Sequence, residues 1–181
     1  AELGDVLFLT KPLGVGILTT AEKKSLLQES HRDLAANQMM QLNKIGEVLG
    51  KLDYVHALTD VTGFGLLGHL TEMAEGSGLT AFLEFSKVPM ITPSIFEYIS
   101  AGSVPGGTNR NRASYGHKIG ALTEEQWAIL ADPQTSGGLL IAVSRDKVRD
   151  LQEILRGNGL EKFAEPIGLM SEKTAYTVEV H

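Results

Sequence analysis

The chain has 181 residues, 43% hydrophobic and 21% charged, which are ordinary proportions for a globular protein. The formal net charge is -6 and no basic stripe is present, so nucleic acid is not an expected partner. Cysteine is absent, which excludes disulfides and thiol chemistry within the chain, and no apolar run approaches the roughly 18 residues that span a bilayer. We expect one domain over residues 1–181, no membrane partner and, because no signal peptide is evident, a cytoplasmic protein.

The first predicted element is a strand. Val6 to Thr10 is a continuous apolar run, consistent with a strand buried on both faces. Lys11 follows it, and could either reach a phosphate from the strand end or be a solvated lysine before a turn. A helix is predicted over 17–27, after two closely spaced glycines.

The longest helical pattern covers residues 33–49, with Asp33 as a cap and Met39 and Met40 as core fillers. Residues 54–58 mix β-branched, aromatic and small side chains. They predict a short buried strand.

The stretch that follows changes from strand to helix within a few residues, and reads Thr59-Asp60-Val61-Thr62-Gly63-Phe64-Gly65-Leu66-Leu67-Gly68-His69. Asp60 would emerge at the carboxyl end of the strand, and the amides after Gly63 would open a helix over 66–75, a natural anion site. A carboxylate beside such a turn suits a metal-bridged phosphate. Alternatively, Asp60 and Thr62 only cap the helix. His69 is interpreted as a structural hydrogen-bonding residue rather than an acid or base.

The middle of the chain predicts a partly exposed strand over 79–85, a short helix over 94–101 and an irregular loop over 102–108. The polar run Asn109-Arg110-Asn111-Arg112 follows that loop. Arginine can bind phosphate oxygens through two N–H groups, so this run is either a phosphate site or a solvated basic turn.

The next helix begins with a capping box formed by Thr123 and Gln126, and Trp127 on it is expected to be a packing anchor. Asp132 and Pro133 end this helix. The following residues, Gln134-Thr135-Ser136-Gly137-Gly138, offer hydroxyls and free amides before an apolar strand over 139–143. They form either a second oxyanion cradle or a plain helix-to-strand turn.

The last third predicts an amphipathic helix over 145–155 and strands over 163–170 and 174–180. The order of elements indicates an α+β or layered α/β fold, with a mixed β-sheet and helices packed on its faces.

Four stretches resemble, in type and order, the motifs of the selenophosphate synthetases (selenide, water dikinases) in their C-terminal half. They are Leu9-Thr10-Lys11-Pro12-Leu13-Gly14, Thr59 to His69, Pro105-Gly106-Gly107-Thr108-Asn109-Arg110-Asn111, and Asp132-Pro133-Gln134-Thr135-Ser136-Gly137-Gly138-Leu139-Leu140. Together they span most of the chain.

The resemblance implies the C-terminal domain of a two-domain synthetase, similar to that of aminoimidazole ribonucleotide synthetase. Such an enzyme converts ATP, selenide and water to selenophosphate, AMP and phosphate with Mg²⁺, and the intact protein is expected to be a homodimer. ATP would be held mainly by an N-terminal half that this sequence lacks. The start at Ala1, without Met and almost directly into a strand, fits a piece whose natural beginning lies upstream. Alone, it is expected to fold but to turn over negligible ATP.

The resemblance also implies roles for particular residues. Asp60 would bind metal, the nucleotide phosphates would contact Thr62, Gly63, Gly65 and Gly137, and catalysis would involve Asn109, Arg110, Asp132, Thr135 and Ser136. Arg112 falls outside the matched motif. Two alternatives stay open: another ATP-dependent synthetase or kinase of the same superfamily, and a non-catalytic nucleotide-binding paralogue.

Overall fold

A mixed six-stranded sheet organises the chain, with the strand order β2-β4-β1-β5-β3-β6. The computed structural model describes residues 1–181. All neighbouring strands are antiparallel except β3 and β6, which are parallel. The predicted α+β class with a mixed sheet is confirmed. The strands are β1 (Val6–Leu9), β2 (Val55–Asp60), β3 (Thr80–Leu83), β4 (Leu139–Val143), β5 (Gly168–Ser171) and β6 (Val178–Val180).

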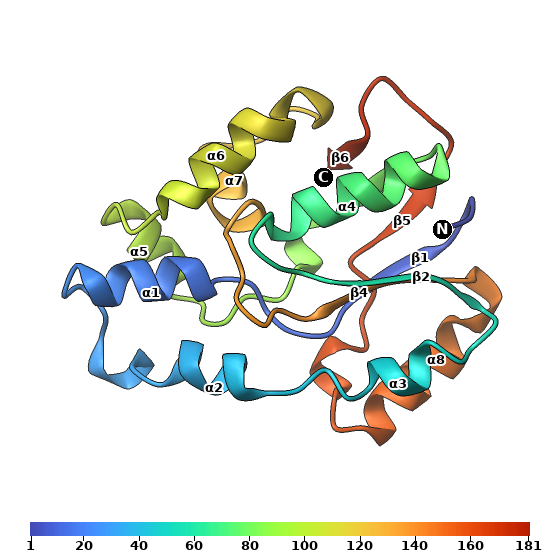
Figure 1. The fold of residues 1–181 in the computed structure, drawn as a ribbon, viewed down its shortest axis with the longest axis horizontal. Coiled ribbons are helices and arrows are strands. Elements are labelled where there is room, and N and C mark those ends of the chain that lie inside the picture. Colours follow the sequence, from blue (N-terminus) through green and yellow to red (C-terminus); the bar gives the residue numbers. More distant parts are fainter.

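Helices lie on both sides of the sheet (Figure 1). None of them combines the length and apolar character needed to cross a bilayer. The α-helices are α1 (Val15–Lys23), α2 (Leu34–Met40), α3 (Gly46–Leu49), α4 (Gly65–Ser77), α5 (Ile95–Ser100), α6 (Gly106–Tyr115), α7 (Glu124–Leu130) and α8 (Val148–Gly157). Short 3₁₀ turns are η1 (Glu29–His31), η2 (Phe85–Lys87), η3 (Gly116–Lys118), η4 (Arg145–Lys147) and η5 (Glu161–Phe163).

Strand β1 lies inside the sheet and is buried on both faces, as predicted. Its side chains alternate between two cores, because successive residues of a strand point to opposite faces. Leu7 and Leu9 join a cluster of 30 buried residues that includes α4 and α7. Phe8 joins a cluster of nine that packs α3 and α8 against β4.

The single helix predicted over 33–49 is wrong. The structure has two short helices, α2 and α3, separated by an irregular segment at residues 41–45. Met40 and Leu42 are 70% and 73% exposed, so Met40 fills no core. Asp33 precedes α2 but makes no side-chain cap. Hydrogen bonds of this segment to distant residues, from Lys11 to the Gln41 carbonyl and from Asn43 to the Gly137 carbonyl, outweigh the helical periodicity.

Two predictions of strand burial are also corrected. Strand β2 lies at the edge of the sheet and is half-buried, not buried. Thr80 in β3 is polar but has no exposed surface, because its hydroxyl donates a 2.7 Å hydrogen bond to the Tyr176 carbonyl. Satisfied polar groups of this kind are readily buried.

The run Asn109 to Arg112 lies in helix α6 and not in a loop. The helix begins at Gly106 after Pro105, although glycine is a poor helix former. At the second position of the helix, Gly107, a close contact requires glycine, because a Cβ there would lie 2.5 Å from Cγ of Pro133. The capping box of Thr123 and Gln126 and the buried position of Trp127 are both confirmed.

Asp132 lies inside the protein and not in the wall of a cleft, since it has no exposed surface. Its Oδ2 accepts hydrogen bonds from the Gly16 amide at 3.0 Å and from Nε2 of Gln134 at 2.8 Å. Its Oδ1 has no partner. Burial raises the pKa of Asp132 to about 7, although these hydrogen bonds oppose the shift. The carboxyl group therefore anchors the start of α1 to the segment after α7.

We predict that Gly168→Ala destabilises the fold. A Cβ there would lie 2.1 Å from the Phe82 carbonyl oxygen within the β3–β5 ladder, and overpacking of this kind costs about 1–3 kcal/mol. Gly76→Ala is the matched control, because nothing lies within 4 Å of its Cβ position in α4. Helix propensity predicts that the control gains up to about 1 kcal/mol. Urea unfolding of both variants measures the difference, and equal stabilities would contradict the packing assignment.

We further predict that Asp132 makes stability depend on pH. Between about pH 4 and pH 7 the unfolded chain releases this proton while the folded chain, with its pKa of about 7, retains it. The wild-type free energy of unfolding should therefore fall through this window, relative to Asp132→Asn, by at most about 4 kcal/mol. Urea unfolding of both proteins from pH 4.5 to pH 8 tests this, and parallel pH profiles would refute it.

Candidate functional site

The four motif stretches meet at one end of the sheet, where β2 ends and β4 begins. The antiparallel ladder pairs Asp60 with Leu139. Beyond the ladder, the Val61 amide donates to the Gly138 carbonyl at 2.8 Å and the Gln134 amide donates to the Thr62 carbonyl at 3.0 Å. The second and fourth stretches therefore run side by side.

The first stretch joins them through Lys11, which follows β1. Its Nζ donates a 2.7 Å hydrogen bond to the Ser136 carbonyl. A Cβ at Gly138 would lie 2.4 Å from the Lys11 amide nitrogen, so only glycine allows this approach.

The third stretch joins through helix α6. The Asn111 side-chain amide donates to the Gly63 carbonyl at 2.9 Å and to the Ala131 carbonyl at 3.0 Å. On the same helix, the Tyr115 hydroxyl donates to the Phe64 carbonyl at 2.6 Å. Asn111 is 7% exposed, so its role is to hold α6 against this end of the sheet.

Most of the residues with a predicted role are accessible at the surface. Thr62 is half-exposed, and the exposed ones are Asp60, Gly63, Asn109, Arg110, Thr135 and Ser136. The other three, Gly65, Asp132 and Gly137, are buried. The structure thus separates groups that can meet a ligand from groups that hold the backbone.

Asp60 ends β2, as predicted, and its side chain is exposed. No side chain caps α4, so the alternative that Asp60 and Thr62 serve as helix caps is not supported. No three His, Asp or Glu side chains of the chain gather closely enough to hold a metal ion. Asp60 can therefore supply one carboxylate ligand, and a cation would need further ligands from outside this chain.

His69 organises the turn after Asp60. Its Nε2 accepts a 3.0 Å hydrogen bond from the Thr62 amide and lies 2.9 Å from the Thr62 hydroxyl. Because Nε2 accepts an amide proton, we assign the ring proton to Nδ1, which lies 3.6 Å from Oε2 of Glu72. These contacts support the structural interpretation of His69.

The glycines of the site have two different functions. Gly65 has a φ of 70° and a Cβ there would lie 2.8 Å from the Ala131 backbone, while a Cβ at Gly137 would lie 2.2 Å from the Val61 carbonyl oxygen. Both are packing positions. Gly63 and Phe64 are exposed, and no acceptor in the chain binds their amides. These N–H groups, just before the start of α4, are therefore available to an anion.

The two arginines of α6 differ in their contacts. Arg112 forms two hydrogen bonds of 2.8 and 3.0 Å with Glu124, and it lies 5.1 Å from the Trp127 ring centroid. The pKa of Arg112 is raised by this carboxylate. Arg110 is exposed and forms no salt bridge, and its guanidinium folds back toward Gly106 at the start of the helix. Arg110 is therefore free to bind an anion.

Ser136 adopts a left-handed conformation with a φ of 50°, which is uncommon for serine. Two side chains hold this turn by its carbonyls, Lys11 at Ser136 and Asn43 at Gly137, where Asn43 Nδ2 donates at 2.9 Å. The hydroxyl groups of Thr135 and Ser136 are thereby left at the surface.

Sequence reasoning missed Asn43 and Gln38. Gln38 is buried and its Nε2 donates to the Pro12 carbonyl at 2.7 Å, which ties α2 to the first stretch. The available signal was Asn43 itself, because asparagine is a poor helix former in the middle of a predicted helix.

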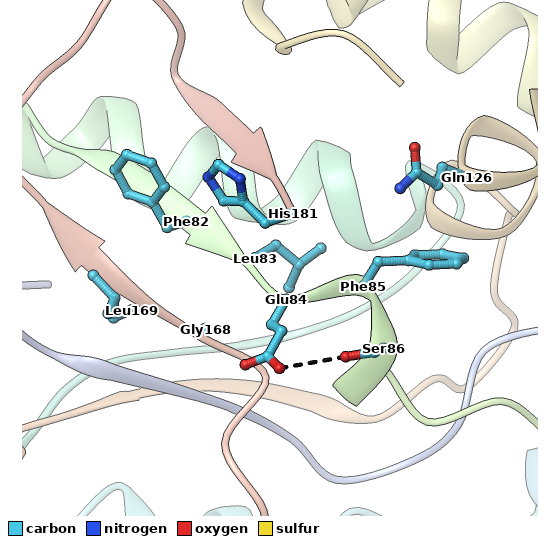
Figure 2. Close-up of a pocket in the computed structure, with 9 residues that line it drawn as sticks. All are labelled: Phe82, Leu83, Glu84, Phe85, Ser86, Gln126, Gly168, Leu169 and His181. Atoms are coloured by element: carbon cyan, nitrogen blue, oxygen red, sulfur yellow. Dashed lines mark hydrogen bonds between the residues drawn. The ribbon is translucent and has the colours of Figure 1, made fainter. Parts of the chain in front are cut away.

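A cavity of about 740 Å³ lies away from the motif stretches, over β3 and β5. Figure 2 shows Phe82, Leu169 and His181 in its wall. The rings of Phe82 and His181 are stacked, with 5.5 Å between their centroids. None of the predicted site residues lines it. The chemistry-bearing groups are thus not in the large cavity but at the motif end of the sheet.

Comparison with known proteins matches residues 2–181 to the family model described as AIR synthase related protein, C-terminal domain. Among curated proteins, the chain is 53% identical over 180 residues to a selenide, water dikinase of Pseudomonas putida, covering 99% of this chain and 52% of that protein. It is 51% identical to the selenide, water dikinase of Haemophilus influenzae, with coverages of 99% and 51%. The chain spans about half the length of these relatives.

Solved structures show the same fold at low identity. A hydrogenase maturation protein HypE in complex with ATP matches with a TM-score of 0.69 and 19% identity, over 99% of this chain and 48% of that one. Thiamine-monophosphate kinase from Stenotrophomonas maltophilia matches with a TM-score of 0.66 and 16% identity, over 99% and 51%. With the family model covering nearly every residue, the chain belongs to the family of AIR synthase related proteins and corresponds to their C-terminal domain.

Proposed function

We propose that the chain is the C-terminal domain of a selenide, water dikinase, which converts ATP, selenide and water to selenophosphate, AMP and phosphate. The observation that carries the proposal is the meeting of all four motif stretches at one end of the sheet, with Asp60, Arg110 and Ser136 exposed there. The relatives named selenide, water dikinase, at 51–53% identity, support the assignment.

Each exposed group has a distinct task in this proposal. Asp60 is a ligand of Mg²⁺, and the remaining ligands come from the N-terminal half of the two-domain protein and from ATP. Mg²⁺ bound between a carboxylate and phosphate oxygens neutralises negative charge during phosphoryl transfer. Arg110 and the amides of Gly63 and Phe64 bind phosphate oxygens. Thr135 and Ser136 donate hydrogen bonds at the same edge, and Asp132 acts on this edge only through the backbone that it anchors.

The alternatives differ in what they require of the chain. A thiamine-monophosphate kinase shares this fold at 16% identity, so the fold alone does not discriminate between the alternatives. The identity above 50% over 99% of the chain favours the selenide enzyme. Selenophosphate synthetases carry a reactive Cys or selenocysteine in their N-terminal half, and a non-catalytic paralogue would lack it. We also propose that the intact protein uses Mg²⁺, forms a homodimer and is located in the cytoplasm.

We predict that Asp60→Asn in the two-domain protein abolishes selenide-dependent AMP release or requires far more Mg²⁺ for it. Asparagine keeps the size of the side chain but removes the charge that holds a divalent cation. The thermal midpoint should not change, because Asp60 is exposed and no helix depends on it as a cap. Asp53→Asn is the control and should keep wild-type Mg²⁺ dependence, because Asp53 is an exposed carboxylate just before β2, at the opposite end of the strand from Asp60. A stability loss with unchanged Mg²⁺ dependence would refute the metal role.

We also predict that Arg110→Lys lowers kcat at least about tenfold, with little change in ATP affinity, if Arg110 binds the phosphoryl group in the transition state. Lysine keeps the charge but cannot donate two parallel hydrogen bonds. Arg112→Lys is the matched control on the same helix, and because its partner is Glu124 it should leave kcat nearly unchanged. Steady-state AMP release measures both. Small and equal effects would remove Arg110 from the site.

A further inference from the structure

Lys11 is a buried cation that the proposed reaction does not use. It follows β1 and is 4% exposed. Its Nζ donates hydrogen bonds of 2.7 Å to the Gln41 and Ser136 carbonyls. The first bond holds the break between α2 and α3, and the second holds the turn that presents the Ser136 hydroxyl.

These contacts leave the ammonium group incompletely satisfied. An ammonium has three N–H donors, and the chain accepts from two of them. No Asp or Glu forms a salt bridge with Lys11, although buried charges are usually paired. Desolvation lowers the pKa of Lys11, which is the expected sign for a cation removed from water without a counter-charge.

The side chain borders a pocket of about 260 Å³ between β1 and residues 41–45. Its polar lining includes Lys11, Asn43, Lys44 and Asn158, and no acidic residue. This is a locally basic cavity in a chain of net charge -6. Its volume lies below the roughly 300–1,000 Å³ of pockets for larger organic ligands, so it suits a small ion.

We propose that this pocket binds a small inorganic oxyanion of the phosphate class, with Lys11 and Lys44 as its charged donors. The third N–H of Lys11 supplies the buried contact, and the exposed Lys44 supplies a second charge at the rim. Only the physiological identity of the ligand rests on the proposed function, in which phosphate is a product and the Ser136 turn belongs to the site. An anion bound to Lys11 would stabilise that turn through the Lys11–Ser136 hydrogen bond.

Phosphate chemistry could come from free phosphate or from a nucleotide, so the experiment has an arm for each. The 181-residue chain is titrated with inorganic phosphate, with AMP and with ATP, and chloride at equal ionic strength serves as the reference. Calorimetry measures the Kd and thermal unfolding measures protection. No turnover is involved, so the result is independent of whether the two-domain protein makes selenophosphate.

We expect saturable phosphate binding that exceeds any effect of chloride. Lys44→Gln should weaken it several-fold, and Lys11→Met at least about tenfold, because hydrogen bonds to charged groups are among the stronger ones. Lys51→Gln is the matched control and should not change the Kd, since Lys51 is exposed and paired with Glu47. Lys44→Gln keeps the test decisive if Lys11→Met fails to fold, because the Lys44 side chain is exposed.

Three results would overturn the proposal. The first is a wild-type response to phosphate no larger than that to chloride. The second is phosphate binding that Lys44→Gln and a folded Lys11→Met both leave unchanged. The third is tighter, Lys44-dependent binding of AMP or ATP than of phosphate, which would make the pocket a nucleotide site.

Discussion

The antiparallel pairing of β2 with β4 is the constraint on which the site depends. It places Asp60 opposite Leu139, and its hydrogen bonds continue past the sheet, from Val61 to Gly138 and from Gln134 to Thr62. Two turns that are more than 70 residues apart in sequence are thereby held as one surface. The other motif stretches attach to these turns through backbone carbonyls, which Lys11 and Asn111 bind with their side chains.

The site therefore has two layers with different chemistry. The lower layer consists of buried polar groups, Asp132, Gln134 and Asn111 among them, whose hydrogen bonds are made within the chain, to backbone or to one another. The upper layer consists of exposed side chains, Asp60, Arg110 and Ser136, which have few partners of their own. Motif residues of both layers look alike in a sequence, because Asp, Asn and Gln serve equally as ligands and as internal hydrogen-bonding groups.

This difference explains how much could be predicted from the sequence. Features that depend on neighbouring residues in the sequence were predicted correctly. They are the end of a strand at Asp60, the capping box at Thr123 and the internal strand β1. The break at residues 41–45, the burial of Asp132 and the helical state of Asn109 to Arg112 depend on contacts with distant segments. Periodicity cannot report such contacts. The metal role of Asp60 and the roles of Thr62, Asn109, Thr135 and the other assigned residues stay predictions.

The position of β1 within the sheet has a consequence for how the chain acquires its structure. Among the six strands of this sheet β1 comes first along the chain, yet its two neighbours, β4 and β5, begin at residues 139 and 168. Contacts across such separations make folding slow, because long loops must close before the contacts form. During synthesis, the apolar residues of β1 therefore have no sheet to join until most of the domain has been made. Over that interval, a nascent chain of this family would expose a strongly apolar segment to chaperones or to aggregation.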